Sequence, residues 1–351
     1  MNNKNLFYLL VAALFLITSC NKDDDNNNNN DSLFQGGAFV LNEGQFQAGN
    51  GTVSFYDPEN QTVENNIFEN INDFPLGDVV QSMTIHNNKA YIVVNNSGKI
   101  EVVDINTFEY EGTILNLTSP RYILPVNGSK AYVTDLFSNT ISVVNLSSNT
   151  ISSTIAVNGN TEELVLASGK VFVTNRSENY VYVINPNNDN IEDSVEVAAG
   201  PSSIQVDNAG KVWVLCGGKT LYDENWNVTG QEPGGLYKIN ASNLSVETAL
   251  DFTTNDSPSK LRINEASNEL YYLNDGVFNL NTSSSSLPGS AIIPSNGRSL
   301  YALNIAPNGD IYTADAIDFL QSGIVYRYAS DATLIDEFTT DIAPNGVYFF
   351  E

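Results

Sequence analysis

The sequence predicts an all-β fold, a seven-bladed β-propeller of four-stranded antiparallel blades that closes by pairing its C-terminal strand with its N-terminal blade. The main observation is a short β-rich segment that recurs seven times along the chain. The second is that the two ends of the chain carry complementary parts of one repeat. No helical periodicity is sustained over the length of a normal helix, which argues against a helical fold.

The spacing of the recurring segment matches one propeller blade. The seven copies begin at Ala38, Ala90, Ala131, Val171, Val212, Leu270 and Ile311. Successive starts lie 52, 41, 40, 41, 58 and 41 residues apart, and a blade of four strands takes about 40 to 45 residues. The period therefore predicts one blade for each copy.

The residues around each copy predict the other three strands of a blade. A second apolar stretch precedes most copies across a polar turn such as Asn87-Asn88-Lys89, a pattern typical of a β-hairpin. A third strand follows, as at residues 139–145, and then a polar turn and a fourth strand, as at residues 151–156. Each repeat is predicted to be a meander of four antiparallel strands.

The two ends of the repeat array complement each other. The first repeat begins at its second strand, Ala38, whereas residues 343–350 read as an inner strand with nothing after it. Pairing these two strands gives every blade four strands and leaves no exposed edge. A chain of 351 residues could hold two domains, but no linker interrupts residues 33–351, so we predict one propeller domain there.

The N-terminal segment predicts export and lipid anchoring. Residues 1–19 have a basic start and an apolar centre too short to span a membrane, as in a signal peptide. The residues before Cys20 resemble a bacterial lipoprotein signal, which implies lipidation of Cys20; the alternative is an ordinary signal peptide with an incidental cysteine. Residues 20–32 are polar and predict a flexible tether. Their Lys22-Asp23-Asp24 run resembles the surface-export signal of Bacteroidota lipoproteins, and the alternative is a solvated linker.

Composition excludes several functions. Asp and Glu number 41 against 15 Lys and Arg, for a net charge of -26, so nucleic acid is not an expected partner. One histidine and two cysteines cannot build the usual zinc site or a disulfide framework. We expect His86 at the surface and Cys216 in the core. We expect no metal, no resident cofactor and no enzymatic activity, and the catalytic alternative is hydrolysis by carboxylates such as Glu162 and Glu163.

Candidate ligand-binding residues lie on loops at the mouth of the central funnel, where ligands of propellers usually bind. Basic residues that do not recur in the repeat stand out in a chain with so few bases, and loop aromatics suit a neutral ligand with flat or apolar faces. By contrast, Asn or Asp recurs after the second strand of most repeats and is expected to bond the backbone of nearby turns. The candidates are Glu43, Gln81, Arg121, Phe137, Glu162, Arg176, Tyr222, Trp226, Lys260, Arg298 and Phe319.

Two resemblances extend these predictions. Tyr132-Val133-Thr134 and Phe172-Val173-Thr174 resemble the YVTN-type propeller repeats of bacterial surface proteins. Residues 39–44, 51–57 and 76–83, together with the lipoprotein signal, resemble the Bacteroidota surface propeller lipoproteins that include the BtuG-type vitamin B12 capture proteins. That family implies a seven-bladed cap on a TonB-dependent outer-membrane transporter, with a corrinoid as the bound ligand.

The resulting hypothesis is a lipid-anchored outer-membrane protein facing the cell exterior. It would capture cobalamin or a related nutrient and deliver it to a TonB-dependent receptor. One alternative is an adhesion or interaction propeller that binds a polysaccharide or a protein partner. The other is a propeller hydrolase or lyase.

Overall fold

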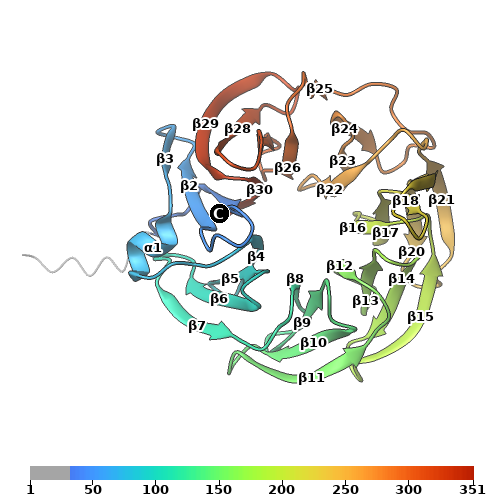
Figure 1. Ribbon diagram of the computed structural model, residues 1–351, viewed down its shortest axis with the longest axis horizontal. Helices are drawn as coiled ribbons and strands as arrows, with labels where there is room; N and C mark the ends of the chain where they lie inside the picture. Colours follow the sequence, from blue (N-terminus) through green and yellow to red (C-terminus); the bar gives the residue numbers. More distant parts are fainter. Residues whose placement is uncertain (1–31) are drawn as a thin grey trace, which may run out of the picture. The chain divides into compact units, whose positions relative to one another are not determined.

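The computed structural model describes residues 32–351, and this part of the chain forms a ring of seven four-stranded antiparallel sheets (Figure 1). The predicted seven-bladed propeller is confirmed. The predicted signal peptide, Cys20 and all of the tether except Ser32 lie outside the described residues. Within residues 32–351, no helix has the length and apolar character needed to cross a membrane.

Each blade has four strands, which we call the inner, second, third and outer strand, counted outward from the centre of the ring. The inner strands are β4 (Val80–His86), β8 (Pro120–Pro125), β12 (Thr161–Ala167), β16 (Pro201–Val206), β22 (Ser259–Ile263), β26 (Leu300–Ile305) and β30 (Pro344–Phe349). The second strands are β1 (Ala38–Asn42), β5 (Lys89–Val94), β9 (Lys130–Asp135), β13 (Lys170–Asn175), β17 (Lys211–Cys216), β23 (Glu269–Leu273) and β27 (Ile311–Asp315). The third strands are β2 (Thr52–Asp57), β6 (Lys99–Asp104), β10 (Thr140–Asn145), β14 (Tyr180–Asn185), β20 (Gly235–Asn240), β24 (Gly276–Asn281) and β28 (Ser322–Tyr328). The outer strands are β3 (Thr62–Glu64), β7 (Tyr110–Ile114), β11 (Thr150–Ala156), β15 (Asn190–Glu196), β21 (Val246–Asp251), β25 (Ile293–Pro294) and β29 (Leu334–Ile342).

The C-terminal strand closes the ring as predicted. Strand β30 pairs antiparallel with β1, with Val347 opposite Val40, so the first blade has the order β3-β2-β1-β30. Each inner strand also contacts the inner strands of both neighbouring blades, from β30 through β4 around to β26 and back to β30. Closure therefore pairs β1 on both sides, with β2 and β30, and gives the first blade an inner strand like those of the other six blades.

The core lies between the blades. Within residues 32–351, seven clusters of buried apolar side chains each join two neighbouring blades. Along β9, Tyr132 enters one cluster while Ala131 and Val133 enter the one on the other side. Alternate residues of a strand point to opposite faces, so a blade buried on both sides needs a continuous apolar run. This requirement explains the recurring segment in the sequence.

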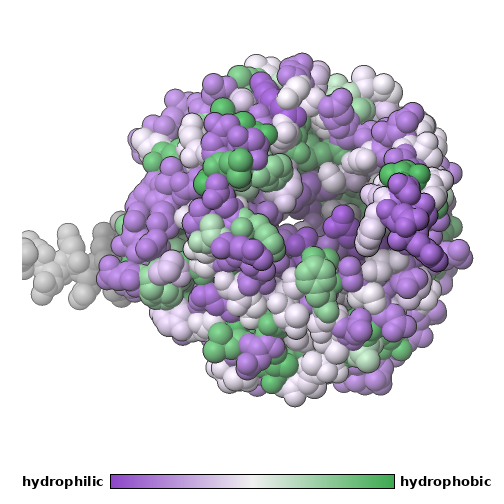
Figure 2. Space-filling view, viewed as in Figure 1, coloured by the Kyte–Doolittle hydropathy of each residue, from purple (hydrophilic) through white to green (hydrophobic). Residues whose placement is uncertain are grey.

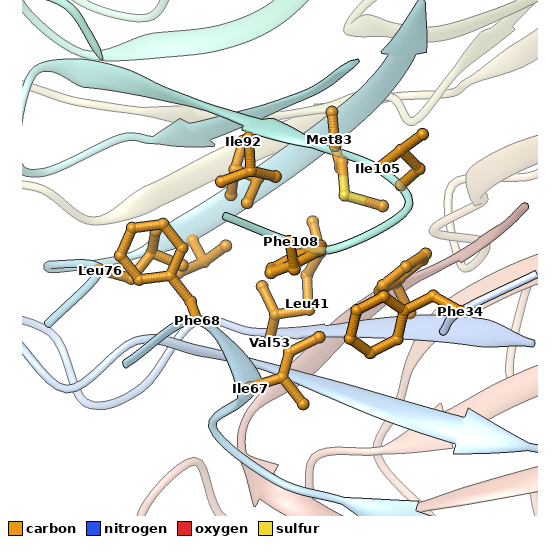
Figure 3. Packing of buried hydrophobic residues seen from close by; sticks show 14 of the residues in the cluster. Phe34, Leu41, Val53, Ile67, Phe68, Leu76, Met83, Ile92, Ile105 and Phe108 are labelled. Carbon is orange, nitrogen blue, oxygen red and sulfur yellow. The ribbon is translucent and has the colours of Figure 1, made fainter. Parts of the chain in front are cut away.

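Two insertions account for the longer spacings in the repeat. Helix α1 (Ile67–Asn72) follows β3, and its Ile67 and Phe68 join the cluster between the first two blades (Figure 3). The second insertion is a hairpin between β17 and β20, formed by β18 (Lys219–Tyr222) and β19 (Val228–Glu232). It leaves the ring at the end where the inner strands begin, because β17 ends opposite the start of β16.

Candidate functional site

A cavity of about 670 Å³ lies where the inner strands begin. Figure 2 shows an opening at the centre of the ring with hydrophilic residues beside it. Seven of the eleven predicted residues line this cavity, and they are Glu43, Gln81, Arg121, Glu162, Arg176, Tyr222 and Lys260.

The cavity is built from irregularities at the start of the inner strands. In every blade the pairing of the inner strand with its neighbour shifts register near this end, so one or two residues have no partner in the ladder. Bulges of this kind redirect a side chain that regular pairing would point elsewhere. The first bulged residue of each blade is, in chain order, Gln81, Arg121, Glu162, Ser202, Lys260, Tyr301 and Asn345. All except Asn345 line the cavity.

Arg121 and Glu162 form the central ion pair. Arg121 Nε donates to Glu162 Oε2 at 2.8 Å, and its Nη1 donates to Gln81 Oε1. Arg176, exposed at the rim, places Nη1 3.6 Å from Glu162 Oε1. Burial is the largest single effect and by itself lowers the pKa of Arg121, but the charge and hydrogen bond of Glu162, together with Tyr122 and Glu43, outweigh it and hold that pKa above its ordinary value. Arg121 therefore stays charged in the cavity wall.

Glu163 belongs to a separate ion pair on the other side of β12. Its Oε1 accepts from Arg262 Nη1 at 2.9 Å, and its Oε2 accepts from the backbone N–H of Ile204 at 3.1 Å. Glu162 instead faces Arg121 on β8. The two adjacent carboxylates thus point to different blades, as expected for neighbouring strand residues, and do not act as a pair.

Lys260 and Glu43 lie in a second polar group of the cavity. Lys260 Nζ donates to the backbone oxygen of Asn345 at 3.1 Å and stands 5.2 Å from the ring centre of Tyr301. Glu43 Oε1 accepts from Tyr301 Oη at 2.9 Å and from Asn345 Nδ2 at 2.8 Å. Tyr301 and Asn345 thus connect the lysine to the carboxylate.

Of the predicted aromatic residues, Tyr222 lines the cavity, and Phe137, Trp226 and Phe319 lie on loops of the same face of the ring. Phe137 and Trp226 are 73% and 82% exposed, and Trp226 lies at the tip of the β18–β19 hairpin with its ring centre 6.0 Å from that of Tyr222. Phe319 packs edge-on against Tyr301, with 4.9 Å between ring centres. All four are on connections between second and third strands, which end on the cavity side.

Arg298, another predicted site residue, contacts two tyrosines outside the cavity. Its guanidinium carbon lies 4.0 Å from the ring centre of Tyr326, and Nη1 donates to Tyr328 Oη at 2.9 Å. These contacts attach the arginine to strand β28 of its own blade. It does not line the cavity.

Two further expectations are confirmed. Cys216 is fully buried in the apolar cluster between the fourth and fifth blades, and burial raises the pKa of its thiol. Four of the five recurring Asn and Asp side chains bond turn backbone, namely Asp135, Asn175, Asn274 and Asp315. The fifth, Asn42, donates instead to Thr52 and Ser54 on the neighbouring strand. Asp135 accepts from the N–H groups of Thr118 and Ser119 through Oδ2 and from those of Phe137 and Ser138 through Oδ1. These residues belong to the scaffold.

Sequence reasoning missed Arg262, Tyr301 and Asn345. Arg262 stands inside the apolar stretch of an inner strand, and a charged residue at such a position was a usable signal. Tyr301 and Asn345 carry no comparable signal, because each is a common residue beside a turn. The register of the bulges, which the sequence does not reveal, brings Tyr301 and Asn345 to Lys260 and Glu43, and the ion pair with Glu163 places Arg262 beside them.

Fold and cavity together define a seven-bladed propeller with a charged central cavity. Residues 36–286 match the family described as domain of unknown function (DUF5074), which is more than half of the chain, and the chain belongs to that family. No curated protein matches the sequence.

Solved propeller structures are similar over most of the chain. A quinoprotein alcohol dehydrogenase-like protein from Bacteroides thetaiotaomicron is 18% identical, with a TM-score of 0.68 over 88% of this chain and 78% of that chain. The periplasmic gluconolactonase of Pseudomonas aeruginosa is 11% identical, with a TM-score of 0.65 over 90% and 99%. A putative 6-phosphogluconolactonase from Bacteroides uniformis is 16% identical, with a TM-score of 0.61 over 89% and 98%. At these identities the likeness is one of fold.

We predict that Asp135 is essential to the scaffold. In the Asp135→Ala variant four backbone N–H groups lose their acceptor, and the free energy of unfolding should fall by about 2–4 kcal/mol in urea denaturation. Asp135→Asn keeps one carbonyl oxygen and should lose roughly half as much. An alanine variant as stable as the wild type would contradict the role assigned to this residue.

We also predict strong coupling between Arg121 and Glu162, whose side chains are 17% and 3% exposed. Arg121→Met should lower the free energy of unfolding by about 3 kcal/mol, because it leaves a buried carboxylate with only the distant Arg176. The double variant with Glu162→Gln should lose less than the two single variants combined. The matched control is the exposed pair Lys89 and Glu111, for which the same double-mutant cycle should give about 0.5 kcal/mol. Equal coupling in both cycles would contradict the prediction.

Proposed function

We propose that this protein is a non-catalytic surface lipoprotein that captures cobalamin or a related nutrient in its central cavity. The observation that carries the proposal is the composition of the cavity. Guanidinium, ammonium, carboxylate and amide groups line its wall, and exposed aromatic rings stand on loops of the same face of the propeller. A corrinoid offers the matching chemistry, because it is a flat macrocycle whose edge carries many amide groups.

The carboxylates of the cavity position the cationic and phenolic groups of its wall. Glu162 Oε2 accepts from Arg121, and Glu43 Oε1 accepts from Tyr301 and Asn345. Within residues 32–351, the buried Glu162 Oε1 has no hydrogen-bond partner. This oxygen is therefore available to accept from an N–H or O–H group of a bound ligand.

The place of the protein in the cell is proposed from its N-terminal sequence. The lipoprotein signal supports a lipid on Cys20 and an outer-membrane location, and the acidic run after it supports a position on the cell exterior. A captured nutrient must then cross the outer membrane. A TonB-dependent receptor is the partner that we propose for this step.

The test is titration calorimetry with cyanocobalamin. We expect binding by the wild-type protein and an affinity at least about tenfold lower for the double variant Tyr222→Ala/Trp226→Ala, because both rings are exposed and free to stack on a ligand. The matched control is Tyr110→Ala. Tyr110 is an exposed tyrosine at the start of β7, on the face of the ring opposite to the one where the cavity opens. It should bind like the wild type.

Absence of binding at micromolar cyanocobalamin would remove the corrinoid assignment. A glycan array run with the same proteins then tests the adhesion alternative. Glycan binding that is lost in the Tyr222→Ala/Trp226→Ala variant would assign the rim to a carbohydrate partner.

A further inference from the structure

Lys260 occupies an unusual place for a lysine. It is the first bulged residue of β22, has a left-handed backbone with φ of 56°, and lines the cavity. A non-glycine residue pays a conformational cost for that backbone, and such costs concentrate at functional positions. The side chain is partly buried, and solvent reaches it through the cavity.

The amine of Lys260 also lacks an acidic partner. Within residues 32–351, five of the eight lysines have a carboxylate oxygen within 4.0 Å, namely Lys89, Lys99, Lys130, Lys211 and Lys238. Lys170, Lys219 and Lys260 have none, and of these three only Lys260 stands on an inner strand. Its contacts are the backbone oxygen of Asn345 and the face of Tyr301. Glu43, the carboxylate of this group, already accepts from Tyr301 and Asn345.

These surroundings disfavour the charged ammonium form. Burial is the main cause, and the nearby positive charge of Arg262 adds to it, which together lower the pKa of Lys260 to about 8. At pH 7.4 a larger share of the molecules therefore carries a neutral amine at Lys260 than at an ordinary lysine. A desolvated lysine beside another cation is the arrangement that activates lysine as a nucleophile.

We propose that Lys260 is a covalent capture site for a small polar aldehyde or ketone, which it binds as a reversible imine. The site goes beyond the nutrient capture proposed above, because it requires no particular nutrient. Arg121, Gln81 and Ser202 line the same cavity and supply hydrogen-bonding groups for hydroxyl or carboxylate substituents on the carbonyl compound.

The chemistry balances without a further reactant. The lone pair of the neutral amine attacks the carbonyl carbon, a C–N bond forms, and a proton passes from nitrogen to the former carbonyl oxygen. The resulting carbinolamine loses its hydroxyl group as water and its second N–H proton, and a C=N bond forms. Because the cavity is open to solvent, water can carry these protons. The net reaction releases one water and involves no oxidation.

The test is residue-resolved reductive labelling of the full-length protein with glyoxylate and sodium cyanoborohydride at pH 7.4. The reductant converts each imine into a stable carboxymethylamine, and peptide mass spectrometry measures the initial rate at each lysine. We expect Lys260 to react at least about tenfold faster than Lys219, an exposed lysine at the mouth of the same cavity. The expected ratio of rates is smaller than the ratio of the neutral-amine fractions of the two lysines, because a less basic amine is a weaker nucleophile.

Two further measurements make the result specific. The rate at Lys260 should rise up to about pH 8 and then level off, and Lys260→Arg should remove this label while labelling of Lys219 persists. A rate at Lys260 equal to or below that of Lys219, or one that climbs steeply up to pH 10, would overturn the proposal. Neither measurement depends on cyanocobalamin binding, so failure here is distinguishable from failure of the proposed function.

Discussion

Burial of every blade on both faces is the constraint on which the structure depends. A four-stranded sheet with apolar side chains on both sides is stable only when another sheet covers each side, and a linear stack would leave two outer faces exposed. Joining seven such sheets in a ring covers all of them, as the seven inter-blade clusters within residues 32–351 illustrate. The pairing of β30 with β1 makes the first blade as complete as the others.

The same constraint explains why the cavity is polar. The inner strands converge on the axis, where no further sheet can cover them, so side chains that leave the inter-blade clusters meet water. The register shifts release one residue or two in each blade at this place, and the released residues include Arg121, Glu162 and Lys260. Partly buried charges are costly without partners, which accounts for the pairing of Arg121 with Glu162 and of Arg262 with Glu163.

The fold was predictable because the same sequence pattern occurs seven times. Each copy of the apolar segment, such as residues 131–135 or 171–175, has the continuous apolar run that a strand buried on both faces requires. A misread boundary in one copy therefore leaves the prediction of the fold unchanged. The site was predictable only in part. Arg121 and Lys260 stood out as rare bases beside turns, but Arg298 did so equally and stacks on Tyr326 instead. A bulge moves one residue from one side of a strand to the other, and its position depends on packing in three dimensions.

The distribution of charge sets the cavity apart from the rest of the molecule. The chain has a net charge of -26, yet three of its five arginines, Arg121, Arg176 and Arg262, stand with Lys260 around the axis. Four basic residues line the cavity, and four acidic ones match them, namely Glu43, Glu162, Glu232 and Asp256. Concentrating the few bases at the axis offsets the acidic charge there, so the cavity has no strong field of one sign. It presents instead a set of directed hydrogen-bond donors and acceptors, fixed in place by the bulges of the inner strands.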